Sequence, residues 1–295
     1  MKSNTFKYIL RVIVGIVFII SSIAKLLSID SFELYIFGFE LFSLGFSYLA
    51  ARLVIAMELA LGIFLIINID SKFIYWVAMT VLSGFTLFLA LLAFAGNEEN
   101  CNCFGEFVNL NPVQSIIKNI ILIAILLLSS KLSSFNLKWK NIWRIIIPIG
   151  AIATIFIVSP PDNWRYENYN RGVTLNEEAF REGFETSVLP QEINEGEKVV
   201  CFYSLKCEFC RKSAQKIGTM RRMGTFSNAE IIAIIGKGED SPDPERYFEE
   251  TKLDCSKYYY ISPSDFLRIT NGSMPLILVM KDGEVIEKFR YRDIH

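Results

Sequence analysis

The 295-residue sequence has a single histidine, His295, and almost no net charge, with a formal value of −1 at pH 7. Zinc sites with histidine ligands and acid–base catalysis by imidazole are therefore largely excluded. No basic run accompanies this balanced charge, so no nucleic-acid partner is expected. Sulfur remains as the main source of chemistry, because the chain has six cysteines: Cys101, Cys103, Cys201, Cys207, Cys210 and Cys255.

Apolar residues, in contrast, make up 52% of the chain and include 24 phenylalanines, which is more than an ordinary soluble protein carries. A helix needs roughly 17–25 apolar residues to cross the ~30 Å hydrocarbon core of a membrane. We predict five such spans, at residues 7–27, 46–67, 73–95, 112–130 and 142–158. The first could instead be read as a cleaved signal segment. Its length and the four spans that follow favour a retained helix.

Basic residues near the span ends predict the orientation, because Lys and Arg concentrate on the cytoplasmic side of a membrane. With the N-terminus inside, the cytoplasmic ends carry Lys2, Lys7, Lys72, Lys131, Lys138, Lys140 and Arg144. The outward loops carry acidic residues instead: Asp30, Glu33, Glu40, Glu98, Glu99 and Glu106. An odd number of spans then places everything after about residue 160 on the outer face.

After Ser159-Pro160-Pro161-Asp162 the composition becomes that of a soluble domain, with mixed charge and short apolar runs. We therefore predict a transmembrane helical domain over 1–160 and an extracytoplasmic domain over 161–295. Thr174 and Glu177 predict a capping box that opens a short helix, and Pro244 predicts the first turn of a helix through Thr251. The predicted strands cover 199–204, 231–235, 258–261, 276–280 and, after a hairpin turn, 285–291.

Cys207 and Cys210 lie between a predicted strand and a helical stretch. A helix N-terminus stabilises a thiolate, so Cys207 is the expected nucleophile, and Cys210, one turn later, would resolve a mixed disulfide. Half of a zinc site and a structural disulfide are the alternatives. Glu208 disfavours the thiolate whereas the basic residues Lys206, Arg211 and Lys212 favour it, so the sequence predicts no redox potential.

This motif, in the string Phe202-Tyr203-Ser204-Leu205-Lys206-Cys207-Glu208-Phe209-Cys210-Arg211, and the later run Gly272-Ser273-Met274-Pro275-Leu276-Ile277-Leu278-Val279 resemble the thioredoxin superfamily, particularly its membrane-tethered TlpA-like branch. The resemblance covers roughly 170–295 and implies an α/β thioredoxin-like domain. It also implies a cis Met274–Pro275 bond that faces the cysteines and positions a partner chain. The sequence departs from the family in having Glu208 where Pro or Gly is usual, and in ending before a full terminal helix.

Cys101 and Cys103 lie in the loop between the third and fourth predicted spans. Two cysteines one residue apart can bridge only through a strained ring, and strained disulfides exchange readily. A passive loop clamp and metal binding are the alternatives.

The Cys-Asn-Cys-Phe-Gly string, with residues 15–26 and 58–62, resembles the DoxX-like/MauE membrane family over roughly 5–130. That resemblance implies a four-helix bundle associated with disulfide formation during periplasmic maturation of enzymes such as methylamine dehydrogenase. The expected fold is thus a membrane α-helical bundle, with a four-helix DoxX/MauE-like core and a fifth tethering helix, followed by the thioredoxin-like domain.

Three ionisable residues, Lys25, Arg52 and Glu58, fall within predicted spans, where charges usually face the bundle interior. Lys25 is close to an outer end, so we expect its ammonium to snorkel outward. Arg52 and Glu58 lie six positions apart and need not pair with each other. Either they form ion pairs with neighbouring helices or they belong to a quinone or proton site.

The two other cysteines lie in the C-terminal domain. Cys201 falls within a strand and is expected to be a buried, inert thiol. Cys255 precedes a strand, and a Cys201–Cys255 bridge stays open at this point.

Together these features predict a thiol–disulfide oxidoreductase of the bacterial cytoplasmic (inner) membrane, with its thioredoxin-like domain in the periplasm. Client thiols would reduce a Cys207–Cys210 disulfide, and the Cys101–Cys103 pair would reoxidise it and pass electrons to a membrane quinone. No metal or covalently bound cofactor is expected; the partners are the lipid bilayer and cysteine-containing extracytoplasmic proteins. The alternatives are a disulfide reductase or isomerase fed by another partner, and a non-enzymatic assembly factor.

Overall fold

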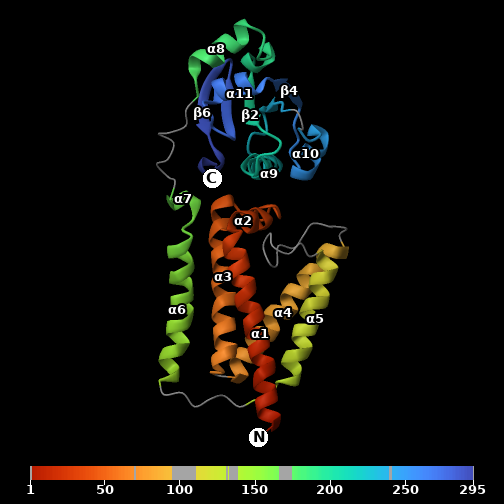
Figure 1. Ribbon diagram of the computed structural model, residues 1–295, viewed down its shortest axis with the longest axis vertical. Helices are drawn as coiled ribbons and strands as arrows, with labels where there is room; N and C mark the ends of the chain where they lie inside the picture. The colour runs from red at the N-terminus through yellow and green to blue at the C-terminus, as the bar shows by residue number, and fades with distance from the viewer. Residues whose placement is uncertain are drawn as a thin grey trace. The chain divides into compact units, whose positions relative to one another are not determined.

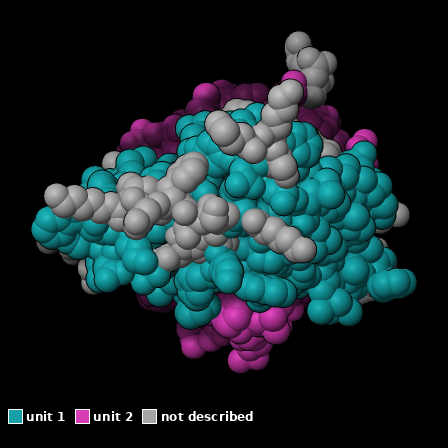
Figure 2. All heavy atoms as spheres, turned by 90° about the horizontal axis from the view of Figure 1, so that it is seen from below, with its two compact units in different colours: residues 1–36, 46–160 teal, residues 37–45, 161–295 magenta. Residues whose placement is uncertain are grey.

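The computed structural model describes residues 2–69, 71–94, 111–130, 132, 139–165, 175–238 and 241–294. The chain divides into two compact units (Figure 2). The first comprises residues 1–36 and 46–160, and the second comprises residues 37–45 and 161–295.

The first unit is built from long apolar helices (Figure 1). They are α1 (Lys2–Leu27), α3 (Leu44–Ile67), α4 (Ser71–Phe94), α5 (Pro112–Leu128) and α6 (Lys140–Val158). In the described residues, four segments are long and apolar enough to cross a membrane: Asn4–Leu27, Leu44–Ile67, Lys72–Phe94 and Lys140–Val158. Helix α5 is apolar too but has 17 residues, the lower limit for a span. The helix α6 runs through Pro148 without ending there.

Helices α1 and α3 approach each other most closely at two glycines. A Cβ atom added to Gly62 would lie 2.7 Å from the carbonyl oxygen of Gly15, and one added to Gly15 would lie 2.8 Å from that of Gly62. Small residues at a helix crossing let the two backbones come into contact, which is how membrane helices gain packing energy without a hydrophobic effect.

A short helix, α2 (Ile29–Phe37), occupies the segment where we predicted an outward loop. Glu33 lies in this helix and is buried, whereas we expected it in that loop. Glu33 is buried because it forms an ion pair with Arg52 of α3. This is a long-range contact, which a local sequence pattern cannot predict.

The second unit is a five-stranded sheet with the order β4-β3-β2-β5-β6. The strands are β2 (Glu197–Tyr203), β3 (Glu230–Gly236), β4 (Lys257–Ile261), β5 (Leu276–Lys281) and β6 (Glu284–Phe289). Strands β2, β3 and β4 pair in parallel, and β5 and β6 are antiparallel to their neighbours. The five predicted strands are therefore present, with ends shifted by one or two residues.

Helices cover both faces of this sheet (Figure 1). Side chains of β2 alternate, so that Val199, Cys201 and Tyr203 pack in one core and Val200 and Phe202 in the other. The first core includes α9 (Glu208–Arg222) and α10 (Pro244–Thr251), and the second includes α8 (Glu177–Glu185) and α11 (Pro263–Thr270). Short helices α7 (Asp162–Arg165), η2 (Gln191–Asn194) and η3 (Tyr291–Asp293) complete the unit.

Local signals explain most of these boundaries. Pro244 opens α10 as predicted, and Asp282 and Gly283 take positive φ angles of 48° and 83° in the β5–β6 turn, as a type I′ hairpin requires. Thr174, where we predicted a capping box, lies outside the described residues; the side chain of Asn176 caps α8 by accepting from the N–H of Ala179. The fold class, a helical membrane bundle followed by a thioredoxin-like α/β domain, is confirmed.

Candidate active site

Cys207 occupies the N-cap position of α9, just beyond the end of β2. Its backbone is extended, with φ −83° and ψ 121°, and its Sγ accepts a hydrogen bond from the backbone N–H of Cys210 over 3.4 Å. An N-cap residue is normally Ser, Thr, Asp or Asn, whose oxygen satisfies a free N–H of the first turn. Here a sulfur takes that place, which puts the thiol at the positive end of the helix dipole.

These contacts lower the pKa of Cys207 to about 6. The largest cause is a hydrogen bond from the Cys210 thiol, and backbone N–H groups of Cys210 and Phe209 add to it. Partial burial and the charge of Glu208 act in the opposite direction. Cys207 is therefore mostly a thiolate at neutral pH, which is the reactive form of cysteine.

Cys210 has the opposite character. Its side chain is fully buried, and its pKa is raised far above the usual range by its hydrogen bond to Cys207 and by burial. The proton of the pair thus stays on Cys210. This asymmetry is what we expect of a half-buried nucleophile at Cys207 and a resolving thiol at Cys210.

The basic residues around the motif are largely occupied by carboxylates. Lys212 pairs with Glu208 at 2.6 Å, one helical turn apart. Arg211 pairs with Glu250 at 2.5 Å, and its guanidinium lies 5.4 Å from the centre of the Tyr247 ring. The opposition between Glu208 and its basic neighbours, which the sequence left open, is thus settled for Lys212 by direct pairing.

The Met274–Pro275 bond is cis, as the resemblance implies. Phe202 of β2 is in register with Leu276 of β5. Because the two strands are antiparallel, Pro275 lies at the end of the sheet where β2 leads into the Cys207 loop. Met274 is 41% exposed, so its side chain is accessible to a partner chain.

The other cysteines differ sharply from this pair. Cys201 is fully buried in β2, and burial raises its pKa to about 12. Cys255 is partly buried, its Sγ contacts the carbonyl oxygen of Lys257 at 3.1 Å, and burial raises its pKa to about 11. Both thiols are free, so the structure has no Cys201–Cys255 bridge. Cys101 and Cys103 lie outside the described residues.

Lys25 does not snorkel, contrary to our expectation. It is 2% exposed, and its Nζ donates to both carboxylate oxygens of Glu58, at 2.7 and 2.8 Å, and to Ser21 Oγ at 2.8 Å. Side chains of a helix lean toward its N-terminus. The lysine near the end of α1 therefore points back into the bundle, where Glu58 of α3 offers a counter-charge.

Arg52 and Glu58 form no ion pair with each other, in agreement with their spacing of six positions. Arg52 bonds to Glu33 of α2 and donates to the carbonyl oxygens of Tyr48, Ser159 and Pro160 at 2.7 to 2.9 Å.

A second buried arginine, Arg11, was not among the predicted site residues. Arg11 donates to Asn68 Oδ1 at 2.9 Å and to the Ser129 carbonyl at 3.2 Å. Those partners follow the last turns of α3 and α5, whose negative dipole ends suit a cation.

Within the residues that the structure describes, no group of three or more His, Cys, Asp or Glu side chains could hold a metal ion.

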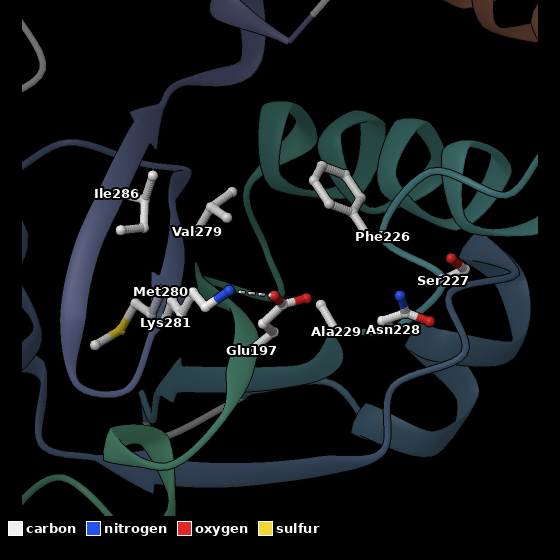
Figure 3. Close-up of a pocket in the computed structure, with 9 residues that line it drawn as sticks. All are labelled: Glu197, Phe226, Ser227, Asn228, Ala229, Val279, Met280, Lys281 and Ile286. Carbon is white, nitrogen blue, oxygen red and sulfur yellow. Dashed lines mark hydrogen bonds and ion pairs between the residues drawn. The ribbon is translucent and has the colours of Figure 1, made fainter.

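A hollow of about 350 Å³ lies at the start of β2, around the Glu197–Lys281 ion pair of 3.0 Å (Figure 3). It is at the opposite end of β2 from Cys207, so it is separate from the thiol pair.

Each comparison with known proteins finds a similar family or protein. Residues 3–132 match the family described as methylamine utilisation protein MauE. The chain is 28% identical over 300 residues to protein TlpB of Flavobacterium psychrophilum, an alignment that covers 85% of this chain and 81% of that one. The solution structure of a thiol:disulfide interchange protein from Bacteroides sp. matches with a TM-score of 0.28 and 17% identity, over 35% of this chain and 70% of that one. The helices at the N-terminal end of the chain thus lie within a region, residues 3–132, that matches the MauE family.

Proposed function

We propose that this protein is a membrane thiol–disulfide oxidoreductase whose Cys207–Cys210 pair exchanges disulfides with cysteine-containing proteins outside the cytoplasm. One observation carries the proposal: Cys207 caps a helix with a pKa of about 6, beside a buried Cys210 that keeps its proton. A structural disulfide needs no such asymmetry.

In the oxidative direction, a client thiolate attacks Cys207 Sγ of the Cys207–Cys210 disulfide. The S–S bond breaks, a client–Cys207 disulfide forms, and Cys210 leaves with the electron pair and takes up a proton. A second client thiolate then attacks the client sulfur of the mixed disulfide, and Cys207 leaves as a thiolate. The client loses two electrons and the pair gains them. The low pKa of Cys207 makes it the better leaving group in this last step.

We further propose that the Cys101–Cys103 pair reoxidises the reduced pair and that electrons pass to a membrane quinone. A bound quinone would supply an acceptor for two electrons and two protons. Groups that can hydrogen-bond its carbonyls come together inside the bundle: Glu58 holds Lys25, and Lys118 of α5 interacts electrostatically with both. Arg52 donates its hydrogen bonds to Glu33 and to three backbone carbonyls, so we give it a structural role in the bundle and no role in quinone binding.

The decisive experiment uses the purified full-length protein in lipid nanodiscs, with a fluorogenic dithiol peptide and decyl-ubiquinone. We expect the peptide to be oxidised and the quinone reduced in equal amounts, with both reactions lost in Cys207→Ser and quinone reduction lost in Cys103→Ser. Cys255→Ser is the matched control and should retain activity. Reduction of a disulfide substrate without any peptide oxidation would instead establish the reductase direction. If Cys210→Ala traps no mixed disulfide with any peptide disulfide, the exchange activity itself is refuted.

A further inference from the structure

Three hydroxyl groups are buried behind the active thiols, and we refer to them as the hydroxyl cluster: Tyr203, Ser213 and Tyr247. They come from the end of β2, from α9 and from α10. The three residues are 0%, 0% and 1% exposed. Among the residues that the structure describes, none of the three oxygens meets a partner with good hydrogen-bond geometry, although the Tyr203 hydroxyl is close enough to Ser213 and Cys201 to interact with both. A buried hydroxyl without a partner costs roughly 1–3 kcal/mol, so three in one place require an explanation.

The hydroxyl cluster lies against the redox pair. Tyr203 and Tyr247 belong to the same core as Cys210, and their ring centres are 6.3 Å apart. Ser213 follows Cys210 by three positions in α9, which places both on one face of the helix. The Tyr203 hydroxyl interacts with Ser213, and the Tyr247 hydroxyl is sensitive to charge on Cys210.

Thiol exchange requires a proton to reach or leave Cys210 in each cycle, whichever way electrons flow. Cys210 is buried, and the residues that act on its thiol are Cys207, Ser204 and Cys201, none of which is a carboxylate. The buried carboxylates described in this unit are Asp162, which binds Arg292, and Asp293 of η3, whose Oδ2 accepts from the N–H of Arg290 and whose Oδ1 has no hydrogen-bond partner. The lone histidine of the sequence is its last residue, outside the described part.

We propose that the hydroxyl cluster, linked by a buried water molecule, carries the proton between Cys210 and solvent. A hydroxyl can accept and donate a hydrogen bond at once, so it passes a proton without becoming charged. Three such hydroxyls also supply the two to four partners that a buried water needs. The solvent end of the path would lie at Arg211, whose side chain is 40% exposed and stacks over Tyr247.

Two features indicate that the tyrosines pass the proton as neutral phenols and do not act as a general base. Burial raises the pKa of both Tyr203 and Tyr247, so neither phenol ionises in the physiological range. Arg211 also places a cation over Tyr247, which favours a negative charge arriving on nearby Cys210 and disfavours an extra proton resting on the phenol.

This inference rests on the proposed exchange activity, and its test separates the two steps of exchange. Full-length reduced protein in detergent is mixed with a peptide disulfide, and the formation and resolution of the Cys207 mixed disulfide are followed by rapid acid quench. The variants are Tyr247→Phe, Ser213→Ala and the double variant; Tyr260→Phe, an exposed tyrosine on β4, is the matched control. We expect resolution to slow about 10-fold in each single variant and about 100-fold in the double variant, within the range of proton-transfer effects.

Formation of the mixed disulfide, and the pH midpoint of Cys207 alkylation, should not change in these variants, because Cys207 does not use the relay. Equal slowing of both steps would show a merely structural role and overturn the proposal. Resolution at the wild-type rate between pH 5 and 9 would overturn it as well. Failure of the wild-type protein to form any mixed disulfide would refute the proposed exchange activity, which is a different result.

Discussion

The Sγ of Cys207 lies 3.4 Å from the backbone nitrogen of Cys210, which donates to it across the first turn of α9. One turn of helix thereby brings together the two thiols, the free N–H groups and the positive dipole end. The pair is held in an arrangement that stabilises one thiolate and one thiol. The chemistry of the domain follows from this difference between two neighbouring cysteines.

Alkylation of the reduced protein should reveal that difference directly. Because the thiolate is the nucleophile, the rate with iodoacetamide should rise with pH around a midpoint of about 6, the pKa of Cys207. Cys255 and Cys201 should react little below pH 9, since burial raises their pKa values to about 11 and 12. Mass spectrometry of the modified peptides checks both statements. In Cys210→Ala the midpoint should move upward, because the largest stabilising hydrogen bond is gone. A wild-type midpoint near 9 would contradict the assignment.

The Glu208–Lys212 pair should tune the reactivity of Cys207. Glu208→Gln removes a negative charge beside the thiolate, so we expect the alkylation midpoint to fall. Lys212→Met leaves the Glu208 charge uncompensated, so the midpoint should rise. Both shifts should be less than about one pH unit, because the Glu208 side chain is 64% exposed and solvent screens it. Lys237→Met, far along the chain on the β3 side, serves as a control. Shifts of the same sign in both Glu208 and Lys212 variants would rule out this account.

The Lys25–Glu58 pair should behave as a buried ion pair of the membrane bundle. Lys25→Met and Glu58→Gln each leave one partner uncompensated, and breaking a buried pair costs about 3–5 kcal/mol. The double variant should be more stable than either single variant, because neither Lys25 nor Glu58 is then left without its partner. Thermal unfolding in detergent, followed by tryptophan fluorescence, measures the three effects, with the exposed Lys72→Met as control. Additive losses in the double variant would show that the two residues act independently.

Two glycines offer a matched test of the α1–α3 contact. In Gly62→Ala the new Cβ would lie 2.6 Å from Ile19 Cγ1 and 2.7 Å from the Gly15 carbonyl oxygen. We expect a destabilisation of about 1–3 kcal/mol from overpacking. Gly84→Ala in α4 adds the same atom where nothing lies within 4 Å, so it should be neutral or stabilise by up to about 1 kcal/mol through helix propensity. Equal effects of the two substitutions on thermal stability would show that the close contact does not matter.

Much of this protein is predictable from local sequence. The long apolar runs predict the helices of the bundle, since helix length follows from membrane thickness. Short apolar runs between turn residues predict all five strands. The position of Cys207 after a strand and before a helix predicts a thiol at the N-terminal end of that helix. These features depend on neighbours within a few residues, which is why a linear pattern is enough to find them.

The tertiary structure alone decided which distant groups meet. It paired Lys25 with Glu58 and Glu33 with Arg52, where the sequence suggested a snorkelling lysine and an exposed glutamate. It also brought Tyr247 of α10 to the thiol pair. Those contacts depend on how helices cross and strands align. The helical repeat of 3.6 residues and the strand repeat of 2 residues in the sequence do not encode them. The sequence determined that Cys207 would lie at the start of a helix, because that depends on adjacent residues; only the packed core determined which side chains surround Cys210.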